Sequence, residues 1–471
     1  MKQKPILMVI LFTVLLVLFG CGKKDEQALD SREAAVDKIV RQKYNQSLAE
    51  LPVVKLVAIS PHNTDIENEF EKAFSLHHAV EQGQKVDIEW RDVGGGSSAI
   101  LQHLRNVYEN SDHSGIDIVW GGGDYNFGKM ADEGILQKMT IAPDVLQNIP
   151  PNFGGLRMYD PEKRWCGSAL SGFGFFYNKQ LLDRLKLSGP VQWEDLGHPS
   201  LYDLVGLADP MLSGSAAASY EMIVQSADNW PAGWAKLLSV LGNAKKFYAG
   251  AGDAAEAVPS GEVAITTCVD FYGTNRVAKY PDTLVYVSPK GQTAFNADPI
   301  AILKNPPNPE LAQRMVDFVL SRQGQALWAL PPGHPDGPFR VSLGRQPIRK
   351  DVYEIYAGKL SPMIVNPYAV GQGMDLDKDL WSITYGLLRH LVWAAAVKNL
   401  DGLKAAKKKL IETDFKTDMM ISFNRLPDNV ATREAIRETD KLLRDKKQQD
   451  IIVTDWIDFF RKQYQEIVKQ E

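Results

Sequence analysis

The chain has 471 residues, of which 44% are hydrophobic and 24% are charged, as in a folded globular protein. This length is too great for one ordinary hydrophobic core and predicts two lobes with appendages. The formal net charge of −5 shows no basic excess, so nucleic acid is not an expected partner.

The first residues have the layout of a secretory signal. Lys2 and Lys4 precede an apolar run over residues 6–20, which is shorter than the ~20 residues that a membrane-spanning helix needs. The run ends at Cys21, and its LFGC ending resembles a bacterial lipobox. The resemblance implies a lipoprotein whose signal peptide, residues 1–20, is removed and whose Cys21 carries acyl chains such as palmitate. More than one acyl chain anchors a protein stably in a membrane.

The alternative to lipidation is cleavage near Cys21 and release as a soluble protein. In both cases the chain leaves the cytoplasm. With the lipid, we expect it in the cell envelope, anchored on the periplasmic or extracytoplasmic face.

Residues 21–50 are polar and charged and predict a tether that can contain a first helix. The apolar run 51–60 predicts a buried strand that ends at Ser60. Apolar residues at helical spacing over 66–74 predict a helix, for which Asn63 or Thr64 is a natural N-cap.

Two further predicted strands, 86–90 and 116–120, are each followed by a glycine-rich turn, Gly94–Ser98 and Gly121–Asp124. The first of these turns leads into another helix. This β-α-β-α-β order predicts an open, mostly parallel sheet with helices on both faces. Ligands of such sheets bind at the carboxyl ends of the strands.

The middle of the chain continues the alternation of strands and helices. Strand 205–208 leads through residues 209–215 into an alanine-rich helix, and strand 263–269 ends at Asp270–Gly273. From about residue 345 the pattern becomes helical. The further helices are predicted over residues 380–397, 433–446 and 455–469.

Several stretches, in this order, resemble the extracellular solute-binding proteins of ABC importers, in the cluster that binds ferric ion, phosphonates, sugar phosphates and polyamines. They are SGFGFFYN (171–178), WEDL (193–196), DP with SGS (209–215), GEVAI (261–265) and NPELAQRMVDFVLSRQGQ (308–325). The last stretch is the most specific. The resemblance covers about residues 52–345.

The resemblance implies an α/β fold of the two-lobed periplasmic-binding-protein type, type II-like, with hinge crossing strands and extra C-terminal helices. Lobe 1 would comprise residues 51–165 and 276–345, and lobe 2 residues 166–275. Residues 346–471 would form a C-terminal helical extension. The ligand would lie between the lobes and would be captured by hinge closure.

The first turn of a helix offers unpaired N–H groups and a positive dipole end, which favour anions. In relatives, a Ser-Gly-Ser/Thr helix start commonly holds a phosphate or another anion, and Ser213–Ser215 is its counterpart here. The alternative is that these positions are ordinary caps and turns. The candidate ligand-binding residues, at strand ends and helix starts, are Ser60, His62, Asn63, Gly95, Ser97, Ser98, Gly122, Asp124, Ser171, Ser213, Gly214, Ser215, Asp270 and Tyr272.

The expected solute is small and anionic, of the phosphate ester or phosphonate type. The alternative is ferric ion, Fe(III), bound through His62 and Tyr272 as a transported ligand, with no resident cofactor. Ferric relatives carry two adjacent tyrosines where this chain has Phe271 and Tyr272, which weakens that alternative. Cys166 and Cys268 could form a disulfide in an exported protein, or be two buried free thiols.

The sequence thus predicts a substrate-binding lipoprotein of an ABC transporter, not an enzyme. Its expected partners are the small-molecule solute, an ABC permease and the membrane through the lipid on Cys21, and it is expected to be a monomer. Two alternatives of another class stay open. An exported hydrolase would need a catalytic motif, and neither Gly-x-Ser-x-Gly nor His-Glu-x-x-His occurs. A ligand sensor would present its liganded form to a signalling partner.

Overall fold

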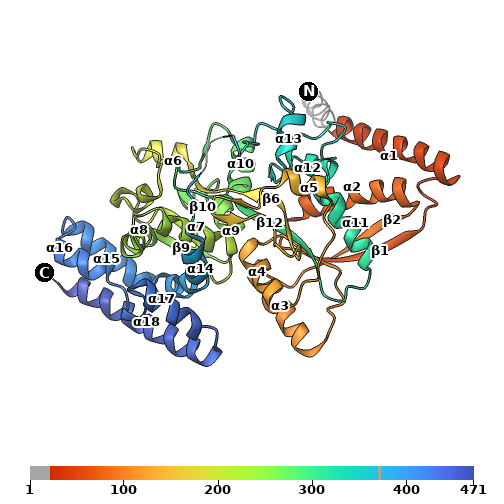
Figure 1. Ribbon diagram of the computed structural model, residues 1–471. Coiled ribbons are helices and arrows are strands. Elements are labelled where there is room, and N and C mark those ends of the chain that lie inside the picture. The colour runs from red at the N-terminus through yellow and green to blue at the C-terminus, as the bar shows by residue number, and fades with distance from the viewer. Residues whose placement is uncertain (1–21, 370–372, 471) are drawn as a thin grey trace, which may run out of the picture.

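The computed structural model describes residues 22–369 and 373–470, and its two large sheets form two lobes (Figure 1). The predicted signal peptide over 1–20 and the predicted lipidation site Cys21 lie outside the described residues. Within the described residues, no helix combines the length and apolarity that crossing a bilayer requires.

Lobe 1 is built on a six-stranded mixed sheet. In spatial order its strands are β13 (Gln346–Pro347), β6 (Cys166–Ser171), β12 (Asn296–Ile302), β3 (Ile118–Trp120), β1 (Val53–Ile59) and β2 (Lys85–Arg91). As the alternating pattern predicts, β1 pairs in parallel with β2 and β3. Strand β12 runs antiparallel to both β3 and β6.

Helices cover the lobe 1 sheet, and a small hairpin flanks it. They are α2 (Thr64–Gln82), α3 (Ser97–Asn110), α4 (Asp124–Asp132), α5 (Pro143–Asn148), α11 (Pro309–Leu320), α12 (Arg322–Ala329) and α13 (Lys350–Ile355), with the hairpin β4 (Asn152–Phe153) and β5 (Leu156–Arg157). Asn63 caps α2, because its side chain accepts a hydrogen bond from the Ile66 N–H at 3.1 Å. The centre of the core is an aromatic cluster in which the Phe70 ring lies 4.7 Å from Trp120 and 4.5 Å from Trp328.

Lobe 2 is built on a five-stranded sheet. In spatial order its strands are β11 (Leu284–Val287), β7 (Phe173–Asn178), β10 (Ile265–Val269), β8 (Val205–Ala208) and β9 (Ala244–Tyr248). Its helices are α6 (Lys179–Arg184), α7 (Gly214–Gln225), α8 (Trp230–Leu241), α9 (Ala251–Ala257) and α10 (Asp270–Lys279), with 3-10 turns at Trp193–Gly197 and Pro199–Leu201.

The lobes are joined by crossing segments. Strands β6 and β7 are separated by Gly172 alone, and β6 pairs in the lobe 1 sheet although the predicted boundary places residue 166 in lobe 2. Likewise β11 pairs with β7 in lobe 2, whereas the prediction places residue 284 in lobe 1. The apolar run through both strands contains no signal of where the partner sheet changes, so the boundary is displaced.

The C-terminal region passes from lobe 1 to lobe 2 and makes the third crossing between the lobes. The Met374 N–H donates to the Thr293 carbonyl at 2.7 Å and the Leu376 N–H donates to the Gly154 carbonyl at 3.2 Å. The helices that follow are α14 (Lys378–Val392), a π-helical turn (Trp393–Val397), α15 (Leu400–Glu412), α16 (Thr417–Asn424), a 3-10 turn (Asp428–Val430), α17 (Arg433–Leu442) and α18 (Lys446–Lys469).

These C-terminal helices share one hydrophobic core with lobe 2 (Figure 1). The Trp234 ring of α8 lies 5.7 Å from Phe460 of α18, and both side chains are fully buried. The Trp230 Nε1–H donates to the Val430 carbonyl at 2.8 Å. The extension is therefore a structural part of lobe 2.

The predicted tether is largely helical in the structure. Helix α1 (Gly22–Tyr44) lies beside α2 (Figure 1), and Val40 is buried in a small cluster with Leu51 and Ala79. The Arg32 guanidinium lies 4.6 Å above the Phe339 ring. Helix α1 is thus docked on lobe 1.

The two cysteines are both free and buried, Cys166 in β6 of lobe 1 and Cys268 in β10 of lobe 2. The disulfide that the sequence allowed is therefore not formed, because the two thiols belong to different sheets. Burial raises the pKa of the Cys166 thiol to about 12 and also raises the pKa of Cys268. Both groups are neutral, unreactive thiols at neutral pH.

Candidate functional site

A cavity of 380 Å³ lies between the lobes, and we call it the cleft. Nine of the predicted site residues line it: His62, Gly95, Ser97, Gly122, Ser171, Ser213, Gly214, Ser215 and Tyr272. Five are not among the lining residues: Ser60, Asn63, Ser98, Asp124 and Asp270. The structure therefore brings together most of the helix starts and turns that the sequence singled out.

Two helix starts face each other across the cleft. Helix α3 of lobe 1 begins after Gly96, and α7 of lobe 2 begins after Ser213. A Cβ atom added at Gly214 would lie 2.7 Å from Ser97 Oγ, and one added at Gly96 would lie 3.3 Å from the Leu212 carbonyl oxygen. The positive ends of both helix dipoles thus converge on one small space.

The capping of the two helices differs. The Ser213 side chain accepts a hydrogen bond from the Ala216 N–H at 3.3 Å, whereas Gly96 has no side chain to cap α3. The first N–H groups of each helix have no acceptor within the helix. Together with the hydroxyls of Ser97 and Ser215, they supply donors to an anion from opposite walls of the cleft.

A buried arginine supplies a cation to the same cleft. Arg345 is 2% exposed, and its Nη1 donates to Asp298 Oδ2 at 2.6 Å while its Nη2 donates to Ser171 Oγ at 2.6 Å. Its guanidinium lies 4.6 Å above the Phe271 ring. Among the described residues, Arg345 Nε has no hydrogen-bond partner. The guanidinium is therefore fixed in position through its two terminal nitrogens, while its Nε–H is unpartnered.

His62 and Asp298 complete a buried network with Arg345. His62 Nε2 lies 2.8 Å from Asp298 Oδ2 and 3.0 Å from Arg345 Nη1, and Asp298 Oδ1 accepts the Gly122 N–H at 2.9 Å. Burial lowers the pKa of His62 despite the nearby carboxylate, so the ring is neutral at neutral pH. Burial alone would raise the pKa of Asp298, but Arg345 and His62 outweigh it and hold that pKa well below its usual range.

The network carries one negative and one positive charge, which largely cancel. Any attraction for an anion in this cleft would therefore come from the two helix starts, rather than from a bare cation. Asp298 also disfavours an anion on the side of the Arg345 guanidinium that it occupies, because its carboxylate would repel a second negative group there.

Two of the predicted residues that do not line the cleft, Asp270 and Asp124, lie in elements next to it. The Asp270 carboxylate accepts the Gly172 N–H at 3.0 Å in the crossing segment, and burial raises its pKa to about 6. Asp124, at the start of α4, is partly buried, and the burial of its carboxyl raises its pKa to about 7. These two carboxyls order the hinge and the α4 turn.

Sequence reasoning missed several lining residues: Asn296, Asp298, Arg345, Tyr385 and the turn Gly250–Asp253. Asp298 lies within a strand and Arg345 lies at the end of the recognised region, so neither falls at a predicted strand end. Tyr385 comes from α14, in the C-terminal region where the sequence predicted no site residue. The Tyr385 hydroxyl donates to the Gly214 carbonyl at 2.9 Å.

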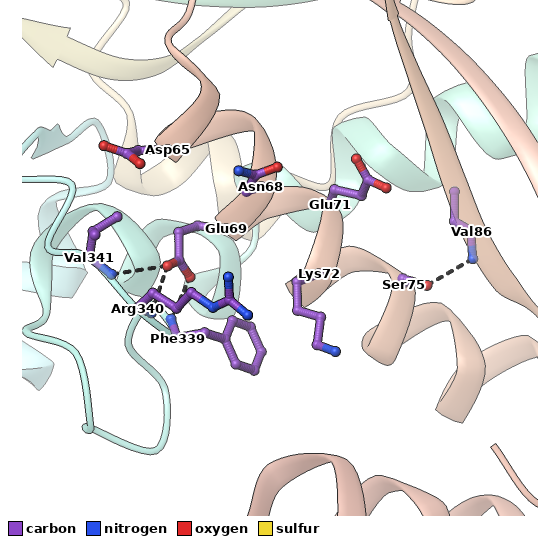
Figure 2. A pocket seen from close by; sticks show the side chains of 10 residues that line it. All are labelled: Asp65, Asn68, Glu69, Glu71, Lys72, Ser75, Val86, Phe339, Arg340 and Val341. Carbon is purple, nitrogen blue, oxygen red and sulfur yellow. Dashed lines mark hydrogen bonds between the residues drawn. The ribbon is translucent and has the colours of Figure 1, made fainter. Parts of the chain in front are cut away.

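Figure 2 shows a second cavity, of 450 Å³, between α2 and residues 339–341 on another face of lobe 1. The Glu69 carboxylate accepts hydrogen bonds from the backbone N–H groups of Phe339, Arg340 at 2.7 Å and Val341 at 3.0 Å. Glu69 thereby fixes the segment that leads to Arg345. This contact explains how a loop holds the cleft arginine in place.

Within the described ranges, no group of three His, Cys, Asp or Glu side chains is arranged to hold a metal ion. His62 and Tyr272, the predicted ferric ligands, both line the cleft. However, His62 Nε2 is already engaged by Asp298 and Arg345. The donor set of the cleft is that of an anion site.

Known proteins resemble this chain in sequence and in fold. Residues 115–335 match the family of bacterial extracellular solute-binding proteins. The phosphoglycerate transport regulatory protein PgtC of Salmonella typhimurium is 29% identical over 161 residues, which are 34% of this chain and 40% of that relative. The match thus spans less than half of the length of the relative.

Two solved structures illustrate the shared fold. The periplasmic binding protein AfuA from Actinobacillus pleuropneumoniae, with fructose 6-phosphate bound, has a TM-score of 0.56, 18% identity, and coverage of 77% of this chain and 99% of its own. Iron-bound HitA from Pseudomonas aeruginosa has a TM-score of 0.52, 19% identity, and coverage of 71% and 98%. These likenesses confirm the predicted two-lobed periplasmic-binding-protein fold.

Proposed function

We propose that the chain is the solute receptor of an ABC importer, because residues 115–335 match the family of bacterial extracellular solute-binding proteins. It captures a small anionic solute, of the phosphate ester or phosphonate type, between its lobes. Solute that contacts both lobes favours the closed state and so shifts the population towards it.

One observation carries this proposal: the first turns of α3 and α7 meet across the cleft beside the buried Arg345. Each helix start presents the equivalent of about half a positive charge and several free N–H groups. A tetrahedral phosphoryl or phosphonyl group has enough oxygens to accept donors from both walls at once. An anion of this shape can therefore hold the two lobes together.

The relatives support the same class of solute. The matching Salmonella protein is named for phosphoglycerate transport, and AfuA was solved with fructose 6-phosphate. The cavity of 380 Å³ is of the size that a phosphorylated three- to six-carbon compound fills. Ferric ion is the weaker alternative, because Phe271 stands where ferric relatives carry a second tyrosine and because His62 Nε2 is held by Asp298 and Arg345.

We further propose that the chain binds and does not catalyse. The histidine and carboxylate of the cleft, His62 and Asp298, are bonded to each other and to Arg345. Neither is paired with a serine or cysteine nucleophile in the manner of a hydrolase. The network is suited to fixed recognition, in which no proton is transferred.

The second candidate is a receptor that reports the solute to a regulatory partner. The name of the Salmonella relative, a transport regulatory protein, favours it. Deleting the chain from its host separates the two candidates. An importer receptor is needed for uptake even when the permease is expressed from a constitutive promoter, whereas a sensor is dispensable there.

We also propose that the chain works outside the cytoplasm as a monomer, held to the membrane by acyl chains on Cys21. Helix α1 then starts directly after the anchor and docks on lobe 1. Incorporation of labelled palmitate into the wild type, but not into a Cys21→Ala variant, tests the anchor.

Calorimetric titration tests the solute class. We expect saturable binding of 3-phosphoglycerate, fructose 6-phosphate or a simple phosphonate, and none of glycerate or fructose. The unphosphorylated compounds are the matched controls, because they differ only in the group that the helix starts would hold. Binding of ferric citrate alone, with a visible charge-transfer band, would replace the proposed solute with iron.

A further inference from the structure

Helix α14 belongs to lobe 2 but reaches across to lobe 1. It is fixed to α7 by the Thr384 hydroxyl, which donates to the buried Glu221 carboxylate, and by the Asp377 N–H, which donates to Gln225 Oε1 at 2.9 Å. Other side chains of α14 contact the first turn of α3 and α4, which are lobe 1 elements.

Two side chains of α14 make the crossing contacts. The Arg389 Nε donates to the Pro210 carbonyl of lobe 2 at 2.6 Å, and its Nη2 donates to Ser98 Oγ in the first turn of α3. The Tyr385 ring lies 4.5 Å from the ring of Tyr125 in α4. We call the Arg389–Ser98 and Tyr385–Tyr125 contacts the latch.

Gly386, the residue after Tyr385, allows this close approach of α14 to α4. A Cβ atom added at Gly386 would lie 2.9 Å from the Tyr125 hydroxyl oxygen, so glycine leaves the space that the lobe 1 tyrosine occupies. Trp381 extends the stack, with its ring 4.8 Å from Tyr385. The rings of Trp381, Tyr385 and Tyr125 therefore form a continuous row from α14 to lobe 1.

The latch lies beside the solute cleft and not at a remote edge. Tyr385 lines the cleft, and its hydroxyl bonds the carbonyl of Gly214 at the start of α7. Ser98, which Arg389 holds, is the neighbour of the lining residue Ser97. The same two α14 side chains thus touch both helix starts that would hold the anion.

Beyond α14 the lobes separate again. A groove of 940 Å³ is lined by residues of α3 and α4 on one side and of α14, α17 and α18 on the other. In the lower part of Figure 1, α3 and α4 lie to the right of α17 and α18. The extension therefore meets lobe 1 along a narrow line, where a few side chains can set the balance between open and closed forms.

We propose that α14 is a latch that completes the anion site: Tyr385 forms part of its wall, and Arg389 is a positioning residue that ties the first turn of α3 to lobe 2. Only the solute-binding part of this inference rests on the proposed function. The effect on lobe closure does not depend on which solute is bound.

Small-angle scattering of the full-length protein without solute tests the closure. We expect Arg389→Ala and Tyr125→Ala to increase the radius of gyration relative to the wild type. The matched control is Arg461→Ala, which removes an exposed arginine of α18 whose partner Asp458 lies on the same helix. An unchanged radius in both latch variants, with native circular dichroism, would overturn the latch.

Milder variants keep the test decisive if alanine disturbs folding. Tyr385→Phe removes only the hydrogen bond to Gly214. Arg389→Lys keeps the positive charge, but a lysine cannot bond the Pro210 carbonyl and Ser98 Oγ in the geometry of the guanidinium. Hydrogen exchange should then quicken at the N–H groups of Ala99 and Ile100, which bond the Gly96 carbonyl at the start of α3, with no change in the core strand β1. Equal exchange at these two groups in Arg389→Lys and wild type would contradict the positioning role.

Affinity for 3-phosphoglycerate tests the link to the cleft. Losing a hydrogen bond that involves a charged group should raise the dissociation constant of Arg389→Ala about tenfold or more. If the wild type does not bind this probe, the proposed solute is wrong, and the scattering and exchange results still decide the latch. Wild-type affinity in Arg389→Ala and Tyr385→Phe would show that α14 takes no part in the site.

Discussion

Arg345 and Asp298 form a buried ion pair, with Nη1 and Oδ2 2.6 Å apart and both residues less than a tenth exposed. The pair joins a loop that follows α12 to a strand of the lobe 1 sheet, at the floor of the cleft. It has consequences for stability as well as for binding.

Breaking this pair from one side should destabilise the protein strongly. Asp298→Asn leaves the Arg345 charge buried without compensation, and the free energy of unfolding in urea should fall by about 3–5 kcal/mol. The exposed pair of Lys441 with Glu438 is the control, since Glu438→Gln should cost less than about 1 kcal/mol. Because the pKa of Asp298 is lowered in the folded state, its contribution is complete above the unfolded pKa near 4 and is lost as pH falls below it. Equal costs for the two variants would contradict the buried pair.

Glu221 should make the protein less stable at alkaline pH. Burial raises the pKa of this carboxyl to about 7, above the ordinary value of 4.5, so the folded state holds a proton that the unfolded state has lost between these pH values. Stability from this group is therefore complete below pH 4.5 and decreases as pH rises to 7. Glu221→Gln should match the wild type near pH 4.5 and exceed it by up to about 3 kcal/mol at pH 8. Melting temperatures of both proteins across this range check it, and a difference that shrinks with rising pH would be evidence against a protonated Glu221.

Variants of the two serines at the start of α7, Ser213 and Ser215, should distinguish helix capping from solute binding. Ser213→Ala loses the cap bond to the Ala216 N–H, so it should lower stability by about 1 kcal/mol as well as weaken binding of 3-phosphoglycerate. Ser215→Ala should weaken binding without a comparable loss of stability. Ser226→Ala, at the other end of the same helix, is the control for both measurements. If calorimetry shows full affinity in Ser215→Ala, that hydroxyl is not a ligand donor.

Gly214→Ala should hinder closure. The added methyl group would lie 2.7 Å from Ser97 Oγ on the opposite wall, so the two helix starts must move apart. Affinity for 3-phosphoglycerate should fall at least about tenfold, while the melting temperature without solute changes little, because each lobe can keep its own packing. Gly128→Ala, in α4, is the control, because its Cβ would meet no atom within 4 Å. Unaltered affinity in Gly214→Ala would place the solute elsewhere.

Thiol titration should find Cys166 and Cys268 reduced but inaccessible. Both are buried with raised pKa values, so a disulfide reagent should react with neither in the native protein and with both after denaturation. Prior treatment with a reductant should change nothing. A reaction after denaturation that requires the reductant would reveal a disulfide.

Much of the fold could be predicted from sequence, because local patterns carry it. The run 51–60 and the cap at Asn63 predict β1 and α2, and Ser213 predicts the start of α7. The exact sheet of β6 was not predictable, because an apolar strand reads the same whichever neighbour it pairs with. The role of the C-terminal helices was also hidden, since their partners are α7 and α8, far away in the chain.

The site was predictable where it depends on main-chain geometry. Glycines and serines at helix starts lie in the cleft as the β-α-β order predicts. Arg345, Asp298 and Tyr385 were not predictable, because each reaches the cleft through a tertiary contact that leaves no local pattern. A charged residue on a strand or loop reads as a solvated side chain until its partner is known.

The shared core of lobe 2 and the C-terminal helices also constrains how the chain acquires its structure. The contact of Trp234 with Phe460 spans almost half of the sequence, so lobe 2 cannot be completed while α18 is still being made or exported. Until then the apolar faces of α7 and α8 stay uncovered and open to aggregation. A nascent or prematurely terminated chain of this protein should therefore depend on a chaperone, although most of lobe 1 is already in place.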